Sequence, residues 1–215
     1  LSNLVGSETL AISGNGSVSD ENVGTNKTIG VDTLSLADGA NGGIASNYTL
    51  AGGTHLLTVN KAIISITGTR QYDGSTDTLP ASSDLVTNDT TSGETLAFSG
   101  SGTVSSANVQ NNQSITLGSI AIADGSGGGL ASNYNLTTGT FDISQKWVSV
   151  GGQKIYDATT TVSSSDLEVT GEVTGESISI TGTGSVTDKN VGSGKTINVS
   201  GLSLSDGSHS ASNYT

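Results

Sequence analysis

The chain repeats itself, and this repetition constrains its fold more than any other feature of the sequence. The residues Ala-Ser-Asn-Tyr end at Tyr48, at Tyr134 and at Tyr214, which lie 86 and then 80 residues apart. An Asp-Gly step keeps the same order, beginning at Asp38, Asp124 and Asp206. A period of about 84 residues far exceeds the coil of a β-solenoid, about 20–29 residues. It is typical of a small domain that occurs in tandem.

Two and a half such periods fit into 215 residues. With boundaries near Lys61 and Lys146, residues 1–60 form the C-terminal part of a first repeat and residues 61–145 a complete second repeat. Residues 146–215 then form the N-terminal part of a third. Because the chain begins with Leu1 rather than Met, we expect it to be part of a longer protein.

The apolar residues within a repeat are spaced as in β-strands. Apolar residues alternate with polar ones in the pairs Leu10 and Ile12, Leu96 and Phe98, and Ile178 and Ile180. This spacing is that of half-buried strands, and Gly-containing turn signals recur about every ten residues. The sequence therefore predicts an all-β protein made of tandem small β-sandwich-like domains arranged as an elongated rod. A β-solenoid is the alternative.

A second apolar pattern predicts an irregularity in each repeat. Apolar residues at Ile29, Val31, Leu34 and Leu36 are spaced by two, three and two positions. One extra residue between two alternating pairs would turn the second pair to the wrong face unless a bulge or sharp bend absorbs it. We predict a β-bulge at the equivalent positions of the three repeats, near Asp32-Thr33, Gly118-Ser119 and Ser200-Gly201.

Composition argues against several classes of function. The formal net charge is −12, which disfavours nucleic acid and anionic lipid as partners. No apolar run approaches the ~20 residues of a membrane-spanning helix. The chain contains no Cys, and its two histidines, His55 and His209, are far apart. The sequence therefore offers no candidate for Cys-ligated zinc, thiol catalysis or a Ser-His-Asp triad. We expect no enzyme, no nucleic-acid partner and no membrane insertion.

Five tyrosines stand at repeated positions. A Tyr-Asp step occurs as Tyr72-Asp73, followed by Gly74, and as Tyr156-Asp157. We expect these tyrosines to pack their rings and bond their hydroxyls locally, since a Tyr between a strand and a turn usually does so. We expect buried anchors of the last strand at Tyr48, Tyr134 and Tyr214.

Two further features support weaker predictions. Asp38, Asp124 and Asp206 precede small residues, so their carboxylates are calcium candidates, although Asp-Gly is also a common turn pair and the dense Asp spacing of a calcium loop is missing. No other cofactor is expected. Trp147, the single tryptophan, lies at a repeat boundary and is expected to stiffen it.

These landmarks resemble a known family. Tyr72-Asp73-Gly74, residues 187–196 and Ser212-Asn213-Tyr214 are similar to the YDG-type tandem repeat domain of bacterial surface adhesins and filamentous-haemagglutinin-like exoproteins. One departure is Ala158, where the family motif has Gly. The resemblance implies a structural segment of a large secreted or surface-anchored bacterial protein, and no enzyme.

Three functions follow as hypotheses. The first is a spacer or stalk in which neighbouring repeats of the chain are the partners, while regions outside it bind a host surface or polysaccharide. The second is a segment of a self-assembling extracellular filament or biofilm matrix, in which other copies supply strands by β-augmentation. The third and weakest is a carbohydrate-binding module, since only 4% of the residues are aromatic.

Overall fold

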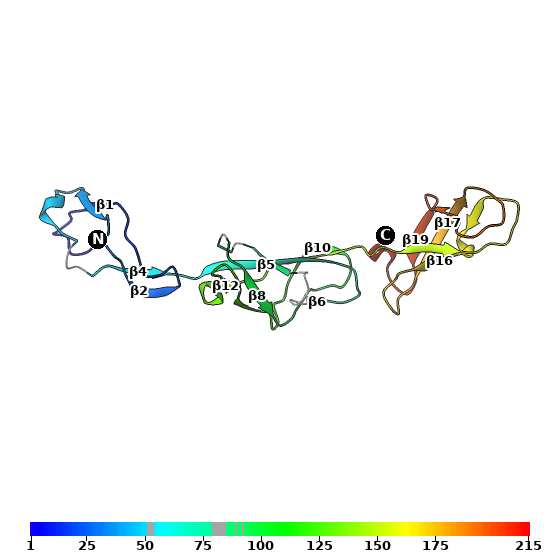
Figure 1. Cartoon of the computed structure of the whole chain (residues 1–215), viewed down its shortest axis with the longest axis horizontal. Helices are drawn as coiled ribbons and strands as arrows, with labels where there is room; N and C mark the ends of the chain where they lie inside the picture. The colour runs from blue at the N-terminus through cyan, green and yellow to red at the C-terminus, as the bar shows by residue number, and fades with distance from the viewer. Residues whose placement is uncertain (51–53, 79–84, 89, 92) are drawn as a thin grey trace. The chain divides into compact units, whose positions relative to one another are not determined.

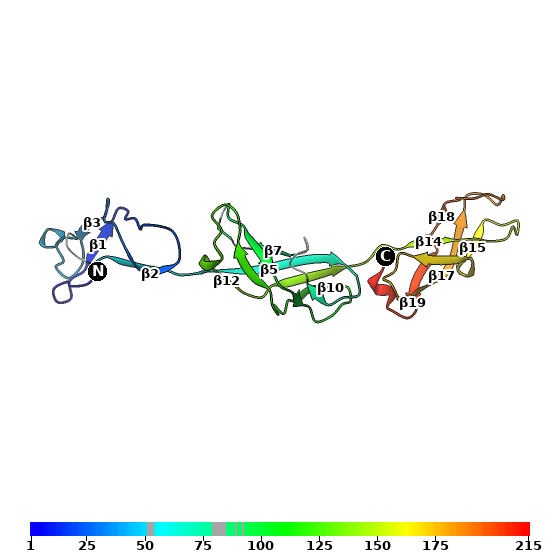
Figure 2. The ribbon, with the colours of Figure 1, turned by 60° about the horizontal axis from the view of Figure 1, so that its bottom comes forward.

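The computed structural model describes residues 1–50, 54–78, 85–88, 90–91 and 93–215, and these residues form strands and short 3-10 turns. They fall into two compact units, residues 1–63 with 129–135 and residues 64–128 with 136–215. Figures 1 and 2 follow the elements along the chain. Within the described residues, no helix has the length and hydropathy needed to cross a membrane.

Residues 1–50 and 54–60, as described, contain two antiparallel strand pairs. Strand β1 (Leu10–Ser13) pairs with β3 (Ser35–Asp38), and β2 (Gly24–Thr28) pairs with β4 (Leu56–Val59). The 3-10 turn η1 (Ala45–Asn47) follows β3.

The second repeat, residues 61–145, contains the largest sheet. Its strand order is β10-β13-β5-β12, and β7 also pairs with β5. The strands of this sheet are β5 (Ala62–Gln71), β7 (Leu85–Asn88), β10 (Gln110–Ser114), β12 (Tyr134–Leu136) and β13 (Thr140–Ser144). The remaining elements are β6 (Asp77–Thr78), β8 (Leu96–Ser99), β9 (Gly102–Thr103), β11 (Ala121–Asp124) and the turn η2 (Ala131–Asn133).

Alternation along β5 shows why these residues form a sheet with a core. Ile64 and Ile66 are fully buried, whereas their neighbour Ile63 in the same strand is 66% exposed. Phe141 and Ile143 of β13 are fully buried as well. β13 runs parallel to β5 and antiparallel to β10, so it lies between these two strands in the sheet.

The third repeat, residues 146–215, forms two smaller sheets. β14 (Ser149–Gly152) pairs with β16 (Leu167–Thr170), and the long β17 (Ile178–Val186) pairs with three other strands. These strands are β15 (Thr161–Ser163), β18 (Ile197–Asn198) and β19 (Leu202–Asp206). Two 3-10 turns complete the repeat, η3 (Ser164–Asp166) and η4 (Ala211–Asn213).

The prediction of tandem small all-β units is confirmed. In the described part of the chain, every sheet is made by strands of one repeat, which is not the stacking of a β-solenoid. The predicted boundary residues Lys61 and Lys146 fall between β4 and β5 and between β13 and β14.

The predicted β-bulges are wrong: each position is irregular, but the irregularity is a turn. At each of the three positions a tight turn bends the chain, with main-chain hydrogen bonds from Leu34 to Val31, from Ile120 to Leu117 and from Leu202 to Val199. Each turn separates the two alternating pairs, so the second pair starts a new strand instead of continuing the first. Bulges lie elsewhere, between Gly24 and Lys27 and between Gln110 and Gln113.

Candidate functional site: the junctions between repeats

An asparagine of one repeat is bonded to the preceding repeat. Asn133, at the end of η2, belongs to the compact unit that holds residues 1–63. Its side-chain Oδ1 accepts a hydrogen bond from the main-chain N–H of Val23 at 3.0 Å, and its Nδ2 donates to Oδ1 of Asn22 at 2.9 Å. The Ser-Asn-Tyr segment of the second repeat is thereby bonded to the Asn-Val step of the first.

The same pair of bonds joins the second and third repeats. Oδ1 of Asn213 accepts from the N–H of Val109 at 2.9 Å, and its Nδ2 donates to Oδ1 of Asn108 at 2.9 Å. Asn213 is only 1% exposed. Because Asn213 is buried, losing these bonds would leave its amide without partners, which destabilises a folded protein by about 1–3 kcal/mol.

A second pair of residues holds each Asn-Val loop in shape. In the first repeat, Nζ of Lys27 lies 2.5 Å from Oδ1 of Asp20, which also accepts the N–H of Asn22. Lys195 and Asp188 repeat this arrangement in the third repeat, at 2.5 Å. The hydrogen bond from Lys27 lowers the pKa of Asp20 to about 2.

The second repeat makes the equivalent loop without charge. Oε1 of Gln113 accepts the N–H of Ser106 at 2.9 Å, and the Ser106 hydroxyl accepts the N–H of Asn108. Ser106 and Gln113 stand where the other repeats have Asp and Lys. The loop geometry therefore needs a hydrogen-bonding pair at these positions rather than an ion pair.

Two tyrosines from different repeats share one buried carboxylate. The hydroxyl of Tyr72 donates to Oε1 of Glu176 at 2.8 Å, and the hydroxyl of Tyr214 donates to Oε2 at 2.5 Å. The two rings meet edge to face with centroids 5.4 Å apart. Tyr72 and Tyr214 are 3% and 2% exposed, and the Glu176 side chain is 8% exposed.

Burial has an electrostatic consequence for these rings. Desolvation, followed by the hydrogen bond to the Glu176 carboxylate, raises the pKa of Tyr72 to about 12. The same two causes raise the pKa of Tyr214 to about 12. Both hydroxyls are therefore neutral donors at neutral pH, and the carboxylate is their acceptor.

The Glu-Tyr part of this arrangement also occurs inside the first repeat. The hydroxyl of Tyr48 donates to Oε2 of Glu8 and accepts the N–H of Val5 at 3.1 Å. Tyr214 likewise accepts the N–H of Val173 at 3.2 Å. Tyr48 and Tyr214, which follow Ser-Asn, thus bond a glutamate of their own repeat. Tyr72 bonds the glutamate of the following repeat.

The Asp and Gly that follow Tyr72 have separate roles. Asp73 accepts the N–H of Ser75 at 2.9 Å and so caps the turn. Gly74 has a positive φ of +78°, and a Cβ there would lie 3.1 Å from Oε1 of Glu176 and 3.3 Å from Val173. Glycine therefore allows both the turn and the close approach to the third repeat.

One apolar cluster extends across this junction. Its buried members include Ile66, Ile115 and Phe141 of the second repeat together with Ile178 and Tyr214 of the third. Tyr72 belongs to the same cluster. The two repeats therefore share a core at this end, in addition to the polar bonds.

The expected local hydrogen bond of Tyr72 is replaced by a bond to a residue 104 positions away. Its counterpart Tyr156 is 57% exposed. Asp157 caps its turn as Asp73 does, through the N–H of Thr159, and Ala158 adopts a positive φ of 62°. Tyr134 is buried, at 3% exposed, whereas Tyr48 is half-buried.

Trp147, which was expected to stiffen its boundary, has a side chain that is 72% exposed and so makes little buried contact there. The boundary is bonded through its main chain: the N–H of Lys146 donates to the carbonyl oxygen of Asn213, and the N–H of Thr215 donates to the carbonyl oxygen of Lys146.

The calcium candidates lie beside the 3-10 turns. Oδ1 of Asp38 accepts the N–H of Ala45 at 2.7 Å, and Oδ1 of Asp206 accepts the N–H of Ala211 at 2.7 Å. These bonds hold the turns that carry Ser-Asn-Tyr. Across the residues that the structure describes, no three His, Asp or Glu side chains, Asp124 included, gather as a metal site. Calcium binding stays a prediction.

Sequence reasoning missed the pairing of the two asparagine motifs. Asn22-Val23, Asn108-Val109 and the Ser-Asn-Tyr segments all keep the repeat period. The bonded residues, however, are 105 to 111 positions apart, so the period itself does not reveal that they meet.

Comparison with known proteins agrees with the repeat structure. No curated protein and no solved structure matches the chain. The family model of the YDG domain matches three successive segments, residues 1–55, 57–141 and 145–215. Nearly the whole chain is covered by these matches, and the protein therefore belongs to the YDG domain family.

Proposed function

We propose that this chain is a structural spacer in which each repeat is fixed to the next, so that a binding region elsewhere is held at a distance. The observation that carries the proposal is the identical pair of side-chain bonds made by Asn133 and Asn213. The same pair of bonds occurs in both compact units, and in this proposal it limits the movement of the bonded segments against each other.

Charge and family are consistent with a setting outside a bacterial cell. The net charge of −12 would discourage lateral clumping of parallel chains. We place the spacer in a secreted or surface-anchored adhesin, as the family resemblance implies. The partners that this role requires are neighbouring repeats, and a host surface or polysaccharide would be bound by other regions.

A carbohydrate-binding role has less support. Tyr72 is 3% exposed, so its ring is not available for stacking on a sugar. Exposed aromatic surface comes from Trp147 and Tyr156, which are few for a module of this kind.

The spacer proposal is tested by measuring the freedom of one repeat against the next. Because the chain has no cysteine, Ser99→Cys and Ser179→Cys allow two spin labels, one in the second repeat and one in the third. Both serines are exposed. We expect one narrow distance distribution, which broadens in N213A because the Asn108–Val109 loop loses both side-chain bonds.

The chain offers a matched control. Asn47 holds the same position in the first repeat, and its side chain is exposed. N47A should leave the distribution narrow. A distribution that is broad without any substitution, or unchanged by N213A, would contradict the spacer proposal.

A further inference from the structure

The rings of Tyr72 and Tyr214 are close enough to react with each other. Tyr72 follows β5 of the second repeat, and Tyr214 follows η4 of the third. Their ring centroids are 5.4 Å apart and the ring planes meet at 77°, so the edge of one ring contacts the face of the other. A covalent bond between these two rings would therefore join the two repeats.

The shared carboxylate brings the same end of both rings together. The hydroxyl of Tyr72 donates to Oε1 of Glu176 at 2.8 Å, and the hydroxyl of Tyr214 donates to Oε2 at 2.5 Å. In a phenol, the ortho carbons flank the hydroxyl, and these are the carbons at which phenoxyl radicals couple. Because both hydroxyls converge on one carboxylate, the coupling positions of the two rings lie at the same end of the pair.

Glu176 also makes the loss of an electron from these rings easier. A phenol that gives up one electron releases its hydroxyl proton, and this step is favoured when a base already accepts that proton in a hydrogen bond. The Glu176 carboxylate accepts from both hydroxyls, and its side chain is only 8% exposed. Both rings therefore have a proton acceptor in place before any oxidation.

Close packing limits the partners that a radical on either ring can reach. Tyr72 and Tyr214 are 3% and 2% exposed. The chain is tight beside them, since a Cβ at Gly74 would lie 3.1 Å from Oε1 of Glu176. An oxidant does not have to touch a buried ring, because an electron can cross several ångströms of protein. A tyrosine of another chain does have to touch it, so each ring has the other as its partner.

We propose that Tyr72 and Tyr214 form a dityrosine cross-link when the protein meets a one-electron oxidant, such as the high-valent haem of a peroxidase that has reacted with hydrogen peroxide. Each ring gives one electron to the oxidant and loses its hydroxyl proton, the first to the Glu176 carboxylate and the second to water. One carbon–carbon bond then forms between an ortho carbon of each ring. The hydrogen on each bonded carbon moves to its oxygen, which restores both phenols. In sum, two electrons go to the oxidant and two protons to water.

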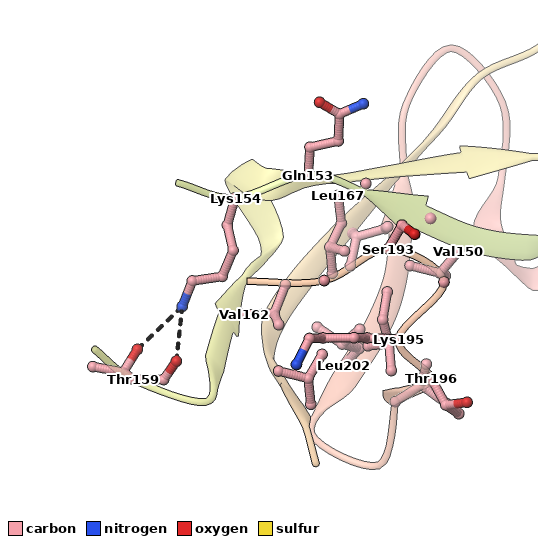
Figure 3. Close-up of a pocket in the computed structure, with 18 of the residues that line it drawn as sticks. Val150, Gln153, Lys154, Thr159, Val162, Leu167, Ser193, Lys195, Thr196 and Leu202 are labelled. Atoms are coloured by element: carbon pink, nitrogen blue, oxygen red, sulfur yellow. Dashed lines mark hydrogen bonds between the residues drawn. The ribbon is translucent and has the colours of Figure 1, made fainter. Parts of the chain in front are cut away.

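Tyr156 offers a matched comparison in the third repeat. It lies in the turn that Lys154 closes, where the Lys154 ammonium donates to Oγ1 of Thr159 at 3.1 Å (Figure 3). The Tyr156 ring is 57% exposed. A radical formed on an exposed ring meets tyrosines of other chains, so Tyr156 should give cross-linked dimers at high protein concentration.

The test oxidises the full chain at low concentration with ruthenium tris-bipyridine, light and persulfate. Dityrosine fluorescence of the monomer and mass spectrometry of the digested chain are the readouts. We expect the monomer to lose the mass of two hydrogen atoms and its cross-linked peptide to join Tyr72 to Tyr214. Tyr72→Phe should abolish this cross-linked peptide, whereas Tyr156→Phe should leave its yield unchanged.

The same oxidation in denaturant shows whether the fold is responsible. There the Tyr72–Tyr214 link should lose its preference over links between other tyrosines. If Tyr72→Phe fails to fold, as judged by circular dichroism, the cross-linked peptides of the unsubstituted chain decide alone. Monomers linked only through other tyrosines, dimers without the internal link, or equal preference in denaturant would each overturn the proposal. The spin-label distances are measured without oxidation, so the spacer role and the cross-link can fail separately.

Discussion

Tyr72 and Tyr156 stand at the same position of successive repeats, and their surroundings differ. Tyr72 is 3% exposed and bonded to Glu176, whereas Tyr156 is 57% exposed. Their own turns are alike, since Asp73 and Asp157 cap them through the same main-chain bond. The comparison teaches that burial of the Tyr-Asp motif comes from the following repeat and not from the repeat that carries it.

The largest expected difference between the two tyrosines is in stability. Tyr72→Ala removes a buried ring from the shared core, and such truncations cost about 3–5 kcal/mol. Tyr156→Ala removes a mostly exposed ring and should cost roughly 0.5 kcal/mol or less. Denaturant unfolding of both variants measures the difference. Equal losses in the free energy of unfolding would contradict the claim that the following repeat buries Tyr72.

The shared carboxylate should have the next largest effect. Glu176→Gln removes the negative charge that accepts bonds from Tyr72 and Tyr214, and hydrogen bonds to charged groups contribute about 1.5–3 kcal/mol. We expect a loss of roughly 2 kcal/mol in the free energy of unfolding. Glu168→Gln, on an exposed position of β16, is the matched control and should be nearly neutral. A neutral Glu176→Gln would show that the two hydroxyls do not depend on the carboxylate.

Alkaline pH should lower the stability of the folded chain through the two buried tyrosines, Tyr72 and Tyr214. An unfolded tyrosine ionises near pH 10, whereas Tyr72 and Tyr214 have pKa values of about 12. The unfolded state therefore loses protons first, so stability is full below pH 10 and falls as the pH rises toward 12.

The measurement is denaturant unfolding at several pH values above 9, compared with Tyr72→Phe, which should lose less stability over the same range. A decline of equal size in that variant would contradict the assignment.

The smallest effect is expected from the charged loop pairs. Asp188→Ser with Lys195→Gln gives the third repeat the neutral pair found at Ser106 and Gln113, which bonds the equivalent loop. Because exposed ion pairs contribute little, the unfolding midpoint should barely change, and its dependence on salt should weaken. A large loss would show that the ion pair, and not the hydrogen bonding, shapes the loop.

Much of the architecture could be predicted from the sequence because it is local. Alternation at Leu10 and Ile12, and again at Ile178 and Ile180, predicts strands, and the structure has β1 and β17 there. The extra residue near Asp32-Thr33 indicated a break in alternation. The spacing alone could not distinguish a bulge from a turn, because either one accommodates one extra residue. The turn forms because the residues after it pair with another strand.

The junctions could not be predicted in the same way. Asn213 meets Asn108, and Tyr72 meets Glu176, only because β13 runs beside β5 and carries the chain into the next repeat. Parallel pairing of distant strands leaves no short-range pattern. The sequence therefore shows which residues repeat, while the fold shows which of them contact a neighbouring repeat.

Chemical modification of the tyrosines tests the central claim most directly. The folded chain would be treated with a tyrosine-specific reagent, and the rate at each tyrosine would be followed by mass spectrometry of its peptide. The account predicts fast modification of Tyr156 and slow modification of Tyr72, Tyr134 and Tyr214, with Tyr48 between them. Equal rates at Tyr72 and Tyr156 would contradict the claim that the following repeat buries the motif.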